Sequence, residues 1–362
     1  MLAKVCPVPV VRAAAAFFLC AGVEIGAQQG AVSGTVRASD DGRVLGYGAV
    51  VAEAVGREQL TTDRGTFLLA NLPARQLTLR FRRIGYLPWD TVVVVPANDT
   101  LRIDVALSPL SRTLEPMRVQ VSRRRVKLSA ECAHDTGTAG GWRLIDLLDQ
   151  VVQNAEQYRL LVKSHPFSLR FTLAHLTRHT DGRVQRTPPT LPGIGATEQV
   201  VLVASATPVY RPGAVFRSVR GVDEVFVPEL QDFASEAFVS KHCFRYDGDT
   251  LIDGTTFIRV SFEPTTELTT ADVRGRFTLR GDGFTLAAVE METTGIPAQF
   301  ARSFSSIRVN TEFTELLPNI AVLSRLESFL VPGTRDRNEA PGVASRGELQ
   351  TLLGVVWSKG PP

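Results

Sequence analysis

Apolar and polar residues alternate along several short stretches in the first third of the chain. The clearest stretch is Gln76–Arg82, in which Leu77, Leu79 and Phe81 are separated by polar residues. A period of two places one set of side chains on a buried face and the other set in water, as in a strand of an antiparallel sheet. Turn residues separate similar stretches throughout residues 30–108, which predicts a compact seven-stranded β-sandwich. The expected strands cover residues 32–36, 47–55, 59–62, 66–69, 76–82, 91–95 and 101–107.

The pattern changes after residue 141. Leu144, Leu147, Leu148 and Val151 recur at helical spacing, with polar residues between them. The period of two then returns in separate strands between residues 167 and 329. A hairpin turn is expected at Asp181-Gly182, an irregular loop at residues 187–197 and a short helix within residues 228–240. One helix against a long antiparallel sheet is an α+β arrangement. The sequence therefore predicts a mainly β protein, with an N-terminal sandwich and a larger α+β domain that has an antiparallel sheet and one packing helix.

The first domain contains a series of short motifs at its expected strands and turns. They are Gly34-Thr35-Val36, Gly48-Ala49-Val50-Val51, Asp63-x-Gly65-x-Phe67, Asn71-Leu72-Pro73, Leu77-Thr78-Leu79 and Ile84-Gly85-Tyr86. With these motifs the domain resembles the carboxypeptidase regulatory-like domain family, and the resemblance covers about a fifth of the chain. It implies a transthyretin-like fold and a carbohydrate-binding-like architecture, in a family that occurs beside metallocarboxypeptidase domains and at the front of TonB-dependent outer-membrane receptors. The sequence departs from the family at Arg75-Gln76, where a glycine is usual.

The second domain has a weaker resemblance, which rests on strand rhythm. The stretch Phe257–Thr294 is similar to envelope proteins that carry the same N-terminal module. It is also similar to the half-barrel of outer-membrane lipoprotein carriers. Neither similarity implies catalytic residues.

The N-terminus has the pattern of a secretory signal peptide. Lys4 and Arg12 supply positive charge, Ala13–Val23 is an apolar run of 11 residues, and small residues precede Gln28. The run is too short to span a bilayer, which takes ~20 helical residues. We therefore expect an exported protein that is periplasmic or associated with the outer membrane.

Five parts are expected along the chain. They are a signal peptide at residues 1–27, the sandwich at 28–108, a linker at 109–141, the β-rich domain at 142–331 and a mobile polar tail at 332–362.

The charge balance bears on the partners. Without residues 1–27 the chain has 38 basic and 36 acidic residues, because Lys4, Arg12 and Glu24 are removed. Such a balance argues against a nucleic-acid partner, which needs a concentrated basic field. The local exception is a basic run, which we expect to be a solvated linker or a peripheral contact with a membrane. This run contains Arg123, Arg124, Arg125 and Lys127.

Cysteine usage agrees with export. Only Cys132 and Cys243 lie outside the predicted signal peptide. Two cysteines in an oxidising compartment form a natural pair, and closing so long a loop stabilises a fold by about 4–5 kcal/mol on the chain-entropy model. We predict a disulfide between them; the alternative is two unrelated buried thiols.

The search for catalytic chemistry is negative. The sequence contains no Gly-x-Ser-x-Gly elbow, phosphate loop, His-Glu-x-x-His or Cys-x-x-Cys. His175 and His179 are four residues apart, but on a strand that spacing is about 13 Å, too far for two ligands of one zinc ion. His242 beside Cys243 could form a thiolate pair, but a cysteine in a disulfide is not a nucleophile. We expect neither an enzyme nor a cofactor.

An acidic stretch has two interpretations. Asp247, Asp249 and Asp253 lie around Gly248 and Gly254 and could supply oxygens to calcium. Two tight turns explain the same residues, and the spacing favours the turns.

The leading functional hypothesis is a non-catalytic exported envelope protein that binds or scaffolds. Its ligand would be envelope polysaccharide, peptidoglycan or an outer-membrane protein. Tyr86 and Trp89 near a turn are candidates for stacking on a sugar, or else they close one end of the sandwich core. The alternatives are a lipid or lipoprotein carrier, which needs an apolar concave sheet face, and an envelope hydrolase.

Overall fold

A computed structural model describes residues 28–111, 129, 131–132, 138–139, 142–188, 199–219, 222–301, 304–332 and 342–362. The predicted signal peptide and the basic run at residues 123–127 lie outside the described residues, as does most of the predicted linker. None of the described helices is long and apolar enough to cross a membrane.

The first domain contains the seven predicted strands in two sheets. The strands are β1 (Gln29–Ala38), β2 (Ala49–Ala52), β3 (Arg57–Leu60), β4 (Thr66–Pro73), β5 (Gln76–Arg82), β6 (Trp89–Val94) and β7 (Thr100–Leu107). One sheet has the order β4-β1-β7 and the other β3-β2-β5-β6. Leu77, Leu79 and Phe81 point into the core between them, as their alternation predicts. Gly65 adopts a positive φ of 67° in the turn that leads to Phe67, another core residue.

The second domain is built on a ten-stranded antiparallel sheet. Its strands are β10 (Phe167–His179), β11 (Val184–Thr187), β12 (Gln199–Val203), β15 (His242–Ile252), β16 (Thr255–Pro264), β17 (Asp272–Arg280), β18 (Leu286–Thr294), β19 (Phe304–Leu317), β20 (Ile320–Pro332) and β21 (Val343–Trp357). The order is β11-β10-β21-β20-β19-β18-β17-β16-β15, and β12 also pairs with β10. This antiparallel sheet with one long helix is the predicted α+β architecture.

The long helix of this domain is α1 (Leu144–Ser164). Its short elements are the 3-10 helix η3 (Leu230–Ala234), the helix α2 (Glu236–Val239), and the strand pairs β8 (Thr138–Ala139) with β9 (Trp142–Arg143) and β13 (Phe216–Val219) with β14 (Val222–Val225). A further 3-10 helix, η1 (Glu53–Val55), lies between β2 and β3 of the first domain. The short helix expected within residues 228–240 is therefore two consecutive turns, η3 and α2. The expected turn at Asp181-Gly182 joins β10 and β11.

The prediction of a mobile tail from residue 332 onward is wrong for its described part. Residues Val343–Trp357 form β21, which pairs with β10 on one side and β20 on the other. The ring of Trp357 lies 5.1 Å from the ring of Phe167, centroid to centroid. The alternation in β21 is weak because only Ser345 and Leu349 are fully buried. This segment forms a strand because it pairs with β10 and β20, and its own residue pattern does not indicate one.

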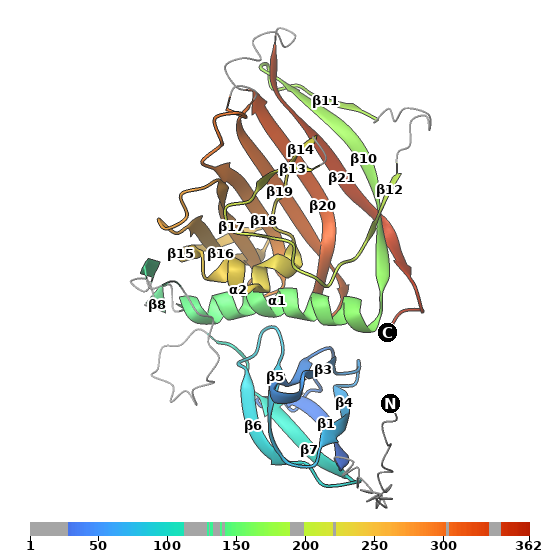
Figure 1. Ribbon diagram of the computed structural model, residues 1–362. Coiled ribbons are helices and arrows are strands. Elements are labelled where there is room, and N and C mark those ends of the chain that lie inside the picture. Colours follow the sequence, from blue (N-terminus) through green and yellow to red (C-terminus); the bar gives the residue numbers. More distant parts are fainter. Residues whose placement is uncertain are drawn as a thin grey trace, which may run out of the picture.

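Apolar side chains cover one face of the large sheet, which we call the inner face. The helix α1, η3 and α2 pack on this face (Figure 1). Phe233 and Phe238 from the short helices meet Phe262 and Phe277 from the sheet, with ring centroids 4.8–6.3 Å apart. Burial of such a side chain stabilises a fold by about 1.5–3 kcal/mol, so this cluster holds the helical layer on the sheet.

The opposite side of α1 contacts the sandwich (Figure 1). Arg82 of β5 binds Asp149 at 2.6 Å and Glu156 at 2.5 Å. Burial lowers the pKa of Arg82, but the carboxylates of Glu156 and Asp149 raise it by more, so the guanidinium stays charged. One helix thus joins the two domains, through apolar contacts on the sheet side and ion pairs on the sandwich side.

A second ion-pair group strengthens this contact between domains. Glu58 of β3 accepts two hydrogen bonds from Arg159, each 2.7 Å long, and one from Lys163 at 3.0 Å. The hydrogen bonds from Arg159 lower the pKa of Glu58 to about 2, although burial opposes the shift. A backbone contact adds to the ion pairs, since the N–H of Gly85 donates to the side chain of Gln150 at 2.7 Å.

Candidate functional site

The outer face of the large sheet carries charged residues. In β16–β18, Phe262, Phe277 and Val289 are buried on the inner face. Successive side chains of a strand point to opposite faces, so Ser261, Arg276 and Glu290, each next to one of these buried residues, point outward. The outer face is therefore polar along the strands whose inner face is most apolar.

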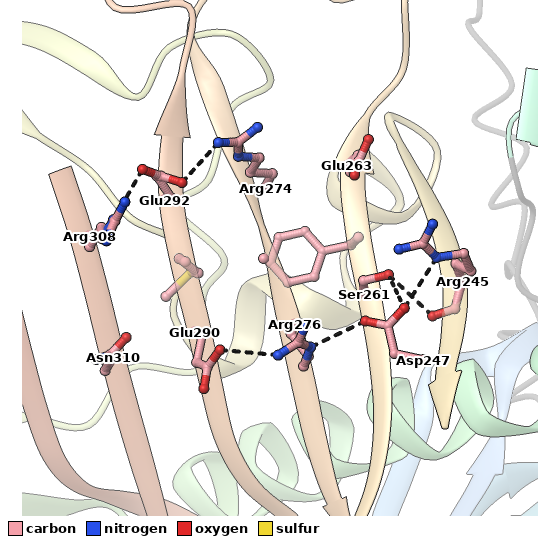
Figure 2. A pocket seen from close by; sticks show the side chains of 13 residues that line it. Arg245, Asp247, Ser261, Glu263, Arg274, Arg276, Glu290, Glu292, Arg308 and Asn310 are labelled. Atoms are coloured by element: carbon pink, nitrogen blue, oxygen red, sulfur yellow. Dashed lines mark hydrogen bonds and ion pairs between the residues drawn. The ribbon is translucent and has the colours of Figure 1, made fainter. Parts of the chain in front are cut away.

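A groove of about 530 Å³ lies on this outer face. Strands β15 to β19 contribute its lining, which includes four arginines and four carboxylates (Figure 2). These charged residues are Arg245, Arg274, Arg276 and Arg308, and Asp247, Glu263, Glu290 and Glu292. Ser261 and Asn310 add neutral hydrogen-bonding groups. Because the formal charges cancel, the groove presents many donors and acceptors without a strong net field.

One ion-pair chain crosses the groove through Arg276 (Figure 2). Its Nε lies 3.2 Å from Asp247 and its Nη1 lies 3.6 Å from Glu290. Asp247 also accepts hydrogen bonds from Ser261 at 3.0 Å and from Arg245 at 3.2 Å. The aspartate lies in a β-bulge of β15, where the register shifts between Tyr246 and Gly248.

A second chain has a carboxylate at its centre. Glu292 binds Arg274 at 2.9 Å and Arg308 at 3.1 Å, from the strands on either side of β18. Glu263 and Asn310 also line the groove, and both are exposed, so their polar atoms are accessible to a ligand.

Hydrogen bonds within the groove lower the pKa of two of its carboxylates. Burial raises the pKa of Asp247, but hydrogen bonds from Ser261, Arg276 and Arg245 lower it by more. Burial likewise raises the pKa of Glu292, and the hydrogen bonds from Arg274 and Arg308 outweigh that effect. Both groups are therefore ionised near neutral pH, whereas a general acid needs a pKa near the working pH. Fixed guanidinium and carboxylate groups can still bind hydroxyl and amide groups of a ligand.

A second polar cluster lies on the inner face and is closed to solvent. Asp272 accepts hydrogen bonds from the hydroxyl of Tyr210 and the N–H of Gly213, both at 2.7 Å, and lies 3.5 Å from Nε2 of His242. The ring nitrogens of His242 also lie 2.9 and 3.0 Å from carbonyl oxygens. Burial raises the pKa of Asp272, but the hydrogen bonds from His242, Gly213 and Tyr210 lower it overall. Since Asp272 and His242 are fully buried, the cluster joins elements of the fold and has no access to a ligand.

A related carboxylate fixes the loop before β13. Asp232 of η3 is fully buried and accepts from the backbone N–H groups of Val209, Tyr210 and Glu229 at 2.7–2.9 Å. Neither Asp232 nor Asp272 was predicted from the sequence. The spacing of Glu229 and Asp232, which form a capping box at the start of η3, was a signal that could have identified one of them.

The predicted disulfide is confirmed. Cys132 and Cys243 are bonded, with their Cα atoms 5.1 Å apart. The bond attaches the segment before α1 to β15, at one edge of the sheet.

Of the two residues predicted to stack on a sugar, Tyr86 is placed wrongly for that role. Its side chain is only 6% exposed and belongs to the sandwich core, and its hydroxyl accepts from Arg43 at 3.1 Å. Trp89 is half-buried and packs against Phe81, with ring centroids 5.8 Å apart. Both rings close one end of the core because their partners lie inside it.

The histidine and aspartate candidates are dispersed. His175 and His179 lie on β10, where Nδ1 of His175 is 3.8 Å from Glu348. Asp249 accepts from the hydroxyl of Tyr246 at 2.7 Å, and Asp253 occupies the β15–β16 turn with a positive φ of 48°. Within the described residues, no group of three or more His, Cys, Asp or Glu side chains could hold a metal ion.

The comparison with family models concerns the first domain. Residues 31–108 match the carboxypeptidase regulatory-like domain. The predicted resemblance is confirmed over this domain, about a fifth of the chain. No curated protein matches the sequence.

The comparison with solved structures gives matches of low identity and low TM-score. A putative outer membrane lipoprotein-sorting protein domain from Vibrio parahaemolyticus is 10% identical, with a TM-score of 0.30 over 59% of this chain and 95% of that one. A putative carbohydrate binding protein from Bacteroides uniformis is 11% identical, with a TM-score of 0.20 over 66% and 92%. A minor pilin from Streptococcus agalactiae is 15% identical, with a TM-score of 0.21 over 25% of this chain, and the match spans about half (49%) of the pilin's length. At these TM-scores the similarities say nothing about ligand or activity.

Proposed function

We propose that this protein is an exported, non-catalytic binding or scaffolding protein of a bacterial cell envelope, and that the groove on the outer sheet face is its ligand site. The ligand class is a polar, hydroxyl-rich polymer such as an envelope glycan or peptidoglycan. The observation that carries the proposal is the composition of the groove. Paired arginines and carboxylates, with Ser261 and Asn310, line a volume that suits a few sugar units.

The balance of charges supports this ligand class over a strongly anionic or cationic one. Each guanidinium in the two ion-pair chains is already neutralised by a carboxylate at 2.9–3.6 Å. A phosphate-rich ligand would have to displace these carboxylates, whereas hydroxyl groups can add hydrogen bonds to ion pairs without breaking them.

The lipid-carrier alternative receives less support. A carrier needs an accessible apolar face, but α1, η3 and α2 pack on the apolar inner face. A lipid would have to displace Phe233 and Phe238 from contacts with Phe262 and Phe277.

Co-sedimentation of the protein without residues 1–27 with purified peptidoglycan, and titration with soluble envelope polysaccharide, test the proposal. We expect saturable binding that Arg276→Ala weakens at least tenfold, since hydrogen bonds to a charged group contribute about 1.5–3 kcal/mol. The matched control is Arg325→Ala. Arg325 pairs with Glu312 and Glu327 but does not line the groove. The proposal would be contradicted if the protein bound neither polymer. It would also be contradicted if Arg276→Ala and Arg325→Ala bound equally well.

A further inference from the structure

The open sheet of the second domain has three described strands on its edges. Strand β15 forms one edge, and β11 and β12 lie along β10 at the other. An edge strand has a row of backbone N–H and C=O groups without a partner strand, and soluble proteins usually protect it with charges, proline, bulges or a covering segment.

Two of these edges have such protection. Strand β15 carries Arg245, Asp247 and a bulge, and the disulfide at Cys243 attaches another segment to it. Strand β11 has the sequence Val-Gln-Arg-Thr, which includes Arg186.

Strand β12 is different. Its sequence, Gln-Val-Val-Leu-Val, has no charge and no proline. Among the described strands it pairs with β10 alone. Three of its four apolar side chains are exposed, with Val201 at 59%, Leu202 at 41% and Val203 at 78%. Strand β12, the most apolar of the three edge strands, therefore lacks the charged residues that protect β15 and β11.

The exposed valines of β12 continue onto the sheet. Ser168 of β10 pairs with Val203 on one side and with Val356 of β21 on the other. Residues paired across a sheet point to the same face, so Val203 and Val356, which is 51% exposed, flank Ser168. Val201 lies two residues along β12 and therefore points to this face as well. We call Val201, Val203 and Val356 the valine patch.

We infer that the β12 edge pairs with the β12 edge of a second copy of this chain, in an antiparallel arrangement about a two-fold axis. This pairing would supply strand partners for the backbone groups of both edges and would place the two valine patches side by side on one face. With Val201 on the axis, Gln199 is opposite Val203 and Val200 is opposite Leu202. No like charges meet, because the strand has none. The same pairing at β11 would bring two copies of Arg186 close together.

The interface is small, since one strand of five residues forms its centre. We therefore expect a concentration-dependent dimer rather than an obligate one. This inference is independent of the groove, which lies on strands β15 to β19.

Sedimentation equilibrium of the protein without residues 1–27 tests the inference. From about 1 μM to about 1 mM we expect a monomer–dimer equilibrium, as suits a small interface. Val201→Lys should weaken dimerisation at least tenfold. Val184→Lys, at an exposed position of β11, is the matched control and should leave the equilibrium unchanged. Thermal unfolding of each variant checks that the fold is kept.

A cross-linking measurement keeps the test decisive if Val201→Lys fails to fold. Directly opposed residues in an antiparallel pair have Cα atoms about 4.5–5.5 Å apart, within disulfide range. Val201→Cys should therefore form a covalent dimer on mild oxidation, whereas Val184→Cys should not. A wild-type chain that stays monomeric throughout, or a dimer that Val201→Lys leaves intact, would overturn the inference. Pairing of the β12 edge with a different protein, and not with a second copy of this chain, would also overturn it.

Discussion

The carboxylates on the two faces of the large sheet differ in their access to solvent. On the inner face, Asp272 and Asp232 are fully buried, and each accepts several hydrogen bonds from segments outside its own strand or turn. On the outer face, Asp247 and Glu292 also have hydrogen bonds and lowered pKa values, but they border an open groove. The difference teaches that a lowered pKa alone does not distinguish a structural carboxylate from one available to a ligand. Enclosure makes the distinction, because only an enclosed group is left with neither a partner nor water when its partner is removed.

The largest effect is expected from Asp272→Ala. This change leaves His242, the hydroxyl of Tyr210 and the N–H of Gly213 buried without their common acceptor. Each buried donor left without its acceptor costs about 1–3 kcal/mol of unfolding free energy, so we expect a loss of about 3 kcal/mol or more. Urea unfolding followed by circular dichroism measures the loss. A cost below about 1 kcal/mol, which is typical of an exposed ion pair, would remove the contrast between the two faces.

An intermediate effect on stability is expected at the contact between the domains. Glu58 forms ion pairs there with Arg159 and Lys163. The pKa of Glu58 is lowered to about 2 in the folded protein, from an ordinary value of 4.5. Its stabilising contribution is therefore complete above about pH 4.5 and is lost as the pH falls towards about 2.

Glu58→Gln isolates this contribution. The difference in unfolding free energy between the wild type and the variant should be constant from pH 7 down to about 5 and should then shrink on acidification. Equilibrium unfolding at a series of pH values measures it. A difference that stays the same down to about pH 2 would show that Glu58 contributes through packing and not through charge.

The smallest effect on stability is expected on the outer face. Arg308→Ala removes one of the two arginines that bind Glu292 and leaves Arg274 in place. Exposed ion pairs contribute about 0–1 kcal/mol, so the urea midpoint should hardly change. A loss above about 2 kcal/mol would mean that the outer ion-pair chains hold the sheet together as the inner carboxylates do.

The alternation of apolar and polar residues was sufficient to predict a strand where one face of the strand is buried and the other is exposed. Leu77, Leu79 and Phe81 alternate strictly with polar residues, and β5 occupies the residues expected for it. The pairing of Cys132 with Cys243 also followed from the sequence, since no other cysteine remained outside the predicted signal peptide. The groove could not be predicted in this way. Its residues come from five strands, and single arginines and glutamates on strands look like any solvated face.

Sequence by itself determined the class of the fold, the family of the first domain and the disulfide, because each depends on local periodicity, a short motif or the number of cysteines. Only the tertiary structure decided that residues 343–357 form a strand between β10 and β20, that Tyr86 is buried, and that Asp232 and Asp272 are enclosed. These outcomes depend on partners distant along the chain. The environment of a polar or weakly alternating segment is set by what packs against it, and its own residues carry little of that information.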